Sequence, residues 1–390
     1  MNFVVNFFHR RGSKDSPTFI WLISLVSLVV ILGLVMVLSS SSIDSLKSSN
    51  NAFGSFLRQL LFVGIGFLAM FVVSRMSINL IYKMTPVAYF VSIGMQLLVF
   101  TGFGVSVKGN TNWIGFFGFS IQPSEFFKLT MVLVCARLIE MRIRSIDDVR
   151  SFTWPVLALG VIGIVLVLAG KDLGTSLIIA MILFGMLLLS GVSWQAIKVP
   201  LLVGIAGVTV LVLTGGSRIG RFQAWLGIGD GTSPYDWQSE HGIWAVAAGR
   251  FNGVGLGNSK LKWTWIPEVE TDYIFAIIGE EWGWIGAVLF ILFFLLLANL
   301  MRRVAIESNT LFKRMTVTGI MLWITIQAFV NIAVVLKLLP VLGVPLPLVS
   351  YGGSSLLSSM LAIGVVLAID RDNHGLVAPP LRMPRRVSVR

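Results

Sequence analysis

The chain has 390 residues, of which 56% are hydrophobic and only 12% are charged, and its mean hydropathy is +0.87. Soluble globular proteins carry about 25% charged residues, so this composition excludes a soluble protein. The net charge of +12 would suggest a nucleic-acid partner in a soluble chain, but here the basic residues follow the expected membrane topology, and we expect no nucleic-acid partner.

Long apolar stretches recur along the whole chain. A helix needs about 20 apolar residues to cross a bilayer, so we predict an all-α polytopic membrane protein with about ten transmembrane helices. A β-barrel would instead show short strands of alternating polarity. The predicted spans are 18–39, 56–74, 84–104, 123–140, 153–169, 174–192, 196–214, 273–300, 316–338 and 354–370. The first apolar run is too long for a signal-peptide core, and we expect it to be retained.

Ten crossings place both termini on one side of the membrane. Cytoplasmic segments are enriched in Lys and Arg, and most of the 30 basic residues fall on inner segments if both termini are cytoplasmic. We therefore expect a cytoplasmic N-terminal segment (1–17), a ten-helix membrane domain (18–370) and a basic cytoplasmic tail (371–390). Between the seventh and eighth spans lies one long extracytoplasmic loop (215–272), rich in Gly and Trp, parts of which could form interfacial helices.

Charged residues near the outer ends of the predicted spans are the first functional candidates. An ionisable group in a bilayer costs roughly 2.5 to 3.5 kcal/mol, so it is rarely kept without a role. Glu125 and Lys128 lie three residues apart on one face of the fourth span, where they could neutralise each other or meet a substrate. Asp172 lies in the tight hairpin before the sixth span, where it could also be a turn or cap residue.

The start of the eighth span carries three further acidic residues. Asp272 is placed where an acidic side chain could cap the helix. Glu280 and Glu281 lie two to three turns deeper, too far along the helix to cap it.

The segment 339–355 is apolar but interrupted by Pro and Gly. Irregular backbone at membrane depth survives only inside the protein or along a cavity. Together with Gln327 and Asn331 of the preceding span, Ser350 and its neighbours predict a polar chamber that opens to the outer side.

Five motifs in order resemble the SEDS family (shape, elongation, division and sporulation proteins), and the resemblance runs from the first span to the tenth. The motifs are Gly109 to Ile114 with Gln122 to Leu129, Asp172 to Thr175, Pro267 to Phe275, Gly279 to Glu281, and Leu339 to Ser355. Lys171 stands where the family usually has Pro, and Arg250 replaces a Gly.

The resemblance implies a peptidoglycan glycosyltransferase that polymerises lipid II, a disaccharide-pentapeptide on undecaprenyl pyrophosphate. It implies action at the outer face of the bacterial cytoplasmic membrane, with the division septum as the expected location. A carboxylate general base must take the proton of the attacking sugar hydroxyl, and Asp272 is the catalytic candidate. The predicted substrate-binding residues are Trp113, Lys108, Glu125, Lys128, Asp172, Lys171, Arg218, Arg221, Glu280, Gln327, Asn331 and Ser350.

Cofactor and partner expectations follow from the same chemistry. The departing pyrophosphate needs cationic donors or a divalent cation such as Mg²⁺ or Mn²⁺. Cys135 is the only cysteine, which excludes an intrachain disulfide and a thiolate metal cluster, and the three histidines are scattered. The resemblance also implies a complex with a class B penicillin-binding protein, a transpeptidase, and with other membrane proteins of the division machinery.

Two other functions fit the composition. One is a flippase or transporter for the same lipid-linked precursor, and the other is a non-catalytic scaffold. A flippase needs a polar lining through the whole membrane, whereas the charged candidates here cluster toward the outer face.

Overall fold

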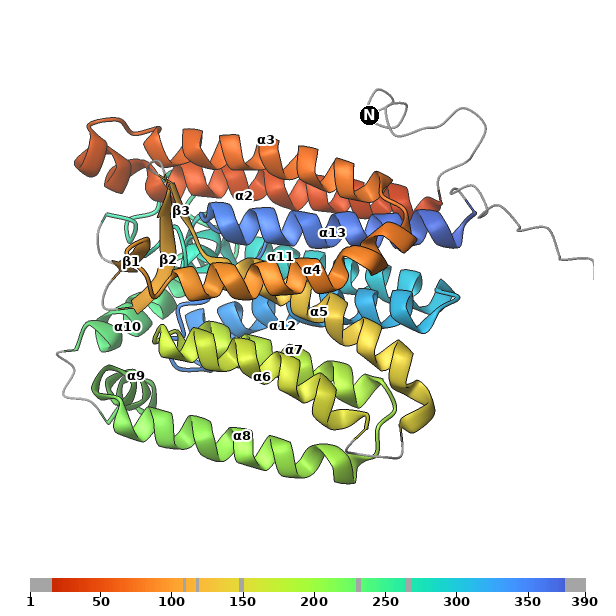
Figure 1. Cartoon of the computed structure of the whole chain (residues 1–390). Helices are drawn as coiled ribbons and strands as arrows, with labels where there is room; N and C mark the ends of the chain where they lie inside the picture. Colours follow the sequence, from red (N-terminus) through yellow and green to blue (C-terminus); the bar gives the residue numbers. More distant parts are fainter. Residues whose placement is uncertain are drawn as a thin grey trace, which may run out of the picture.

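The computed structural model describes residues 16–107, 110–116, 119–146, 151–228, 233–263 and 268–375. Within them, long helices lie side by side in a bundle, and a small sheet and two shorter helices gather at one end (Figure 1). The long helices are α2 (Pro17–Ser49), α3 (Gly54–Arg75), α4 (Ile78–Leu98), α5 (Pro123–Arg142), α6 (Thr153–Ala169), α7 (Leu173–Leu189), α8 (Trp194–Thr214), α11 (Ile274–Glu307), α12 (Leu311–Val335) and α13 (Gly353–Asn373). Each predicted span overlaps one of them.

Length and apolar composition mark these helices as those of a polytopic membrane protein. In the described ranges, α2, α3, α11, α12 and α13 are each long and apolar enough to cross a bilayer. The helices α6 and α7, of 17 residues each, are also apolar but shorter, and α8 is an apolar helix of 21 residues. A polytopic helical membrane protein is therefore confirmed.

The helices α5, α12 and α13 form the buried centre of the bundle. Small residues allow close approach there, as is common between membrane helices. A Cβ on Gly66 of α3 would lie 2.4 Å from the Met360 sulfur of α13, and one on Gly364 would lie 2.9 Å from the Met70 carbonyl oxygen. Gly66 thus makes room for the Met360 side chain, and Gly364 lets the α13 backbone approach the α3 backbone directly.

The segment after α4 forms a three-stranded antiparallel sheet, which the all-α prediction missed. Its strands are β1 (Gly104–Val107), β2 (Asn110–Phe116) and β3 (Phe119–Ile121), in the order β1-β2-β3. The run is rich in β-branched and aromatic residues, which favour strands. The amide of Thr111 donates to the carbonyl of Gly170 (3.1 Å), which fixes β2 against the hairpin between α6 and α7.

The long loop contains two helices, as the sequence analysis allowed. They are α9 (Gly216–Leu226) and α10 (Pro234–Ala248), and both lie at the sheet end of the bundle (Figure 1). Trp225 of α9 donates its indole N–H to the carbonyl of Lys337 (3.0 Å), so α9 is fastened to the segment that follows α12.

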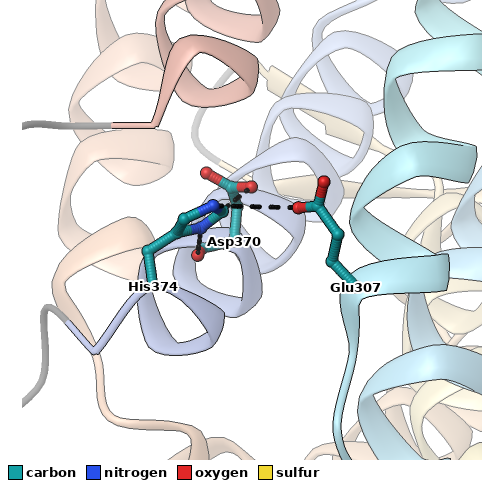
Figure 2. A group of neighbouring side chains, drawn as sticks. All are labelled: Glu307, Asp370 and His374. Atoms are coloured by element: carbon teal, nitrogen blue, oxygen red, sulfur yellow. Dashed lines mark hydrogen bonds and ion pairs between the residues drawn. The ribbon is translucent and has the colours of Figure 1, made fainter.

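At the opposite end of the bundle, polar contacts hold three helix ends together. Glu307 ends α11, and Asp370 and His374 lie one turn apart at the end of α13 (Figure 2). The His374 ring nitrogen Nε2 is 3.8 Å from Glu307 Oε2. The hydroxyl of Ser16, the N-cap of α2, donates to Asp370 Oδ2 (2.6 Å).

Candidate active site

The irregular segment Leu339–Gly352, between α12 and α13, is the centre of the candidate site. We call it the proline-rich segment. The side-chain amide of Asn331 donates to the Val344 carbonyl and to the Asp272 carbonyl, both at 2.7 Å. The amide of Gln327, one turn earlier on α12, donates to the Pro345 carbonyl (3.0 Å). The predicted polar wall between the last two spans is therefore built mainly from α12 side chains that bind backbone.

Asp272 lies at the start of α11, directly beside this segment. Its backbone N–H donates to the Glu268 carbonyl (3.0 Å). The residue is partly exposed, and a Cβ placed on Gly343 would lie 3.4 Å from Asp272 Oδ2. The carboxylate of the predicted general base thus lies against the Gly343 backbone of the proline-rich segment.

Asp172 reaches the same region from α7. Its carboxylate caps that helix by accepting from the Thr175 backbone N–H (2.9 Å) and hydroxyl (2.8 Å). Gln122 also donates to it, at 3.3 Å. A Cβ on Gly174 would lie 2.2 Å from the Leu342 carbonyl oxygen, so the first turn of α7 is pressed against the proline-rich segment.

The environment of Asp172 has opposing effects on its ionisation. Burial disfavours the charged form and raises the pKa of the Asp172 carboxyl, although the hydrogen bonds from Thr175 oppose this change. The side chain is therefore both a helix cap and a candidate for proton or substrate contacts.

Glu125 and Lys128 form a buried ion pair near the proline-rich segment. Lys128 Nζ lies 2.7 Å from both Glu125 Oε1 and Gln327 Oε1, and the side chains of the ion pair are at most 2% exposed. The Lys128 ammonium also lies 5.0 Å from the ring centroid of Trp323. The two charges neutralise each other, as one interpretation of their spacing held, and Gln327 connects them to the proline-rich segment.

Glu280 and Glu281 belong to a different cluster. Glu280 accepts from the Ser259 hydroxyl (2.5 Å) and the Lys260 backbone N–H (2.8 Å). Glu281 accepts from the Ser39 hydroxyl (2.6 Å) and forms an ion pair with Lys262 (3.4 Å). These contacts hold the loop after α10 against α11 and α2, and they separate Glu280 from the buried pair of Glu125 and Lys128.

The remaining described candidates lie at the sheet end of the bundle. Arg221 of α9 donates to the Val341 carbonyl (3.4 Å), and its guanidinium lies 5.0 Å from the ring centroid of Tyr235. Arg218 lies one turn earlier on α9 and is partly buried, and Trp113 is half-buried on β2. Lys171 is exposed beside Asp172 with a positive φ of 69°. Lys108 lies outside the described residues.

Sequence reasoning missed several residues that shape this region. Ser259 and Lys262 fix the loop after α10, and Trp225 attaches α9 to Lys337, just before the proline-rich segment. The abundance of Trp and Arg in the long loop is the only signal that pointed toward this region. It gives no information about which side chain meets which helix.

A resident metal would need several ligands close together. In the described ranges, the one group of three or more His, Asp, Glu or Cys side chains with ligand atoms within 4.8 Å of each other is Glu307, Asp370 and His374. These residues lie at the far end of the bundle from Asp272 (Figures 1 and 2). Among the described residues, the side chains around Asp272 do not form such a group.

Fold and site together define a class, namely polytopic membrane proteins in which acidic, basic and amide side chains converge on an irregular segment at one end of a helix bundle. Comparison with known sequences specifies this further. Residues 19–375 match the FtsW/RodA/SpoVE family of cell cycle proteins, and the chain belongs to that family.

Similar proteins are found among both sequences and structures. Stage V sporulation protein E of Bacillus subtilis is 33% identical over 92% of this chain and 98% of that protein. The probable peptidoglycan glycosyltransferase FtsW of Geobacter sp. is 35% identical over 88% of this chain and 94% of its own length. The crystal structure of RodA from Thermus thermophilus covers 93% of this chain and 99% of its own, with a TM-score of 0.69 and 26% identity.

A chain from a peptidoglycan synthase complex that coordinates polymerization and crosslinking superposes with a TM-score of 0.72 and 25% identity. It covers 90% of this chain and 97% of its own length. These similarities confirm the resemblance inferred from the motifs.

Proposed function

We propose that this chain is a peptidoglycan glycosyltransferase that polymerises lipid II into glycan strands at the outer face of the cytoplasmic membrane during septal wall synthesis. Relatives named probable peptidoglycan glycosyltransferase FtsW, which are 32 to 35% identical over most of this chain, support the activity. The observation that carries the proposal is the placement of the Asp272 carboxylate beside Gly343, on the segment that Asn331, Gln327 and Arg221 also contact.

The proposed reaction uses Asp272 as the general base. Its carboxylate accepts the proton of the acceptor sugar hydroxyl while that oxygen bonds to the anomeric carbon of the donor. The bond between this carbon and the pyrophosphate oxygen breaks, and the lipid pyrophosphate leaves with the electron pair. Arg218 and Arg221 on α9 are the nearby cations that we propose for the leaving group. A divalent cation could accompany the pyrophosphate itself.

The proposed topology has ten spans with both termini in the cytoplasm. Trp side chains prefer the two membrane interfaces. Exposed Trp21, Trp154 and Trp194 lie in the first turns of α2, α6 and α8, which start at the proposed inner face. At the other end, exposed Trp244 and Trp284 accompany α10 and α11. This distribution supports membrane interfaces at both ends of the bundle, and the proposed orientation itself rests on the enrichment of Lys and Arg in the inner segments.

The proposed partners are lipid II, a class B penicillin-binding protein and other membrane proteins of the division machinery. A synthase complex that coordinates polymerization with crosslinking contains a chain of the same fold, and this supports a transpeptidase partner. The names of the FtsW relatives support a location at the septum.

The assignment is tested by Asp272→Asn in the full chain, reconstituted in liposomes with a class B partner and fluorescent lipid II. We expect polymer formation to fall by at least about 100-fold, because general-base catalysis contributes about 10²- to 10⁴-fold. Glu240→Gln, an exposed acidic residue on α10, is the matched control and should retain activity. Near-normal polymer from Asp272→Asn would refute the base, and transbilayer movement of lipid II without polymer from the unmodified chain would indicate a flippase.

A further inference from the structure

We infer that Asn331 and Ser350 are positioning residues that hold the Asp272 backbone, and that they do not bind substrate. This inference rests on the proposed function, because it concerns the same reaction. It changes the role that the sequence suggested for both residues and makes a different kinetic prediction.

Both side-chain donors of Asn331 are directed at backbone, whereas its side-chain oxygen has no hydrogen-bond partner among the described residues. Its side-chain amide has two N–H donors, and these go to the carbonyl of Asp272 and the carbonyl of Val344, each at 2.7 Å. Asn331 is 1% exposed. A substrate would find no free donor on this side chain, because both protons already bridge α11 and the proline-rich segment.

Ser350 holds the residue before Asp272 in the same way. Its hydroxyl donates to the Thr271 carbonyl (2.5 Å) and accepts from the Leu346 backbone N–H (2.9 Å). A hydroxyl has one proton to donate, so this donation uses it up. The next residue, Tyr351, donates its backbone N–H to the Glu270 carbonyl (2.8 Å). Three successive carbonyls, at 270, 271 and 272, are thus bound from the proline-rich segment or α12.

These hydrogen bonds fix the position of the Asp272 backbone, from which its side chain extends. The Asp272 N–H is also occupied, by the Glu268 carbonyl at 3.0 Å. With its own N–H, its own carbonyl and the preceding carbonyl all held, the backbone cannot rotate to redirect the carboxylate without breaking a hydrogen bond. A displacement of about 1 Å in a catalytic group can cost about 100-fold in rate.

The test compares Ser350→Ala, Ser350→Thr and Asn331→Leu in the reconstituted polymerisation assay, with kcat and KM for lipid II measured separately. We expect kcat to fall about 10- to 100-fold in Ser350→Ala and Asn331→Leu, while KM stays within about twofold of the unmodified chain. Ser350→Thr keeps the hydroxyl and should recover most of the lost kcat.

Two buried polar residues serve as matched controls. Among the described residues, neither the hydroxyl of Ser359 on α13 nor the side-chain amide of Gln96 on α4 has a hydrogen-bond partner. Ser359→Ala and Gln96→Leu therefore remove buried polar groups of the same types without releasing Asp272, and kcat should stay near the unmodified value.

A rise in KM with kcat unchanged would overturn the inference and restore a substrate-binding role. Unchanged kcat and KM in both variants would also overturn it, as would a Ser350→Thr enzyme no better than Ser350→Ala. These outcomes are separate from failure of the proposed function, which is decided by Asp272→Asn in the same assay. If Asp272→Asn forms no polymer while Ser350→Ala and Asn331→Leu keep full kcat, only the positioning role fails.

Discussion

The pair of Glu125 and Lys128 shows how far single residues could be interpreted from sequence. Their spacing of three residues placed them on one helix face and allowed either mutual neutralisation or substrate contact. The structure shows the neutralised arrangement at 2.7 Å. The third member, Gln327, comes from α12. It could be suspected as a polar residue in an apolar span, but its partner depends on how two distant helices pack.

Removing one charge of this pair should be more harmful than removing both. Lys128→Met leaves Glu125 buried and unpaired, which costs about 3 to 5 kcal/mol in a buried ion pair. We expect a lower thermal unfolding midpoint and less folded protein in detergent. Adding Glu125→Gln should restore part of the loss.

The control for this prediction is Lys198→Met, because Lys198 is an exposed lysine on α8. It should leave the unfolding midpoint unchanged. A Lys128→Met protein as stable as the Lys198→Met protein would show that the buried pair does not stabilise the fold.

Asp172 has a structural role that connects two helix ends. The sequence left open whether it was a cap or a site residue, and the structure shows that it does cap α7. The same carboxylate accepts from Gln122, which directly precedes α5, so it also joins two helix ends next to the proline-rich segment.

At the scale of elements, α11 has a kink that the sequence did not predict. Gly283 has φ 68° and ψ −163°, which breaks the helical hydrogen bonding there. The backbone groups that have no helical partner at the kink form hydrogen bonds with the loop after α10. Val254 N–H donates to the Glu280 carbonyl (3.0 Å), and Trp284 N–H donates to the Arg250 carbonyl (2.9 Å). The predicted span 273–300 ran through this position, because apolar residues occur on both sides of the Gly279 to Gly283 stretch.

Gly283→Ala should disrupt this junction. The positive φ disfavours a residue with a Cβ, and that Cβ would lie 2.3 Å from the Gly253 backbone nitrogen. We expect a lower yield of folded protein and reduced polymerisation, measured by size-exclusion chromatography and by the liposome assay.

Gly257→Ala is the control that distinguishes the strain of a positive φ from the steric clash of the added Cβ. Gly257 also has a positive φ, of 78°, but its added Cβ would meet no atom within 4 Å. It should therefore lose much less than Gly283→Ala. Equal effects of the two substitutions would contradict the close packing of the loop on the kink.

The sheet is the second element that the sequence analysis did not find. The longest of its three strands has seven residues, and the segment lies between two long apolar helices. Short strands of this kind depend on pairing with each other and on the Gly170 carbonyl of a distant hairpin. Tertiary contacts of that type leave no periodic pattern in the sequence.

At the scale of the whole molecule, hydropathy predicted the helices well because the bilayer imposes a common length on them. The ten predicted ranges overlap the ten long helices among the described residues. The packing of those helices was not predictable, because lipid-facing and protein-facing residues are both apolar. The separation of Glu280 from the buried pair of Glu125 and Lys128 follows from that packing.

The proposed topology can be tested with single cysteines and a membrane-impermeant maleimide. Cys135 is buried, so the native thiol should react little. Glu240→Cys on α10 should be labelled from the outer side, and Glu307→Cys at the end of α11 should be labelled from the inner side. Right-side-out and inverted vesicles provide the two measurements. Labelling of both cysteines from one side would contradict an odd number of crossings between them.

The way the proline-rich segment is held has an evolutionary consequence. Asn331, Gln327 and Arg221 all bind its main-chain carbonyl oxygens, and every amino acid supplies the same carbonyl. Side chains along this stretch can therefore be exchanged during sequence drift while the path of the chain is preserved. Randomised libraries of this segment should tolerate apolar residues of similar size at the buried Val341 and Val344. They should tolerate few substitutions at the three residues that bind its carbonyl oxygens.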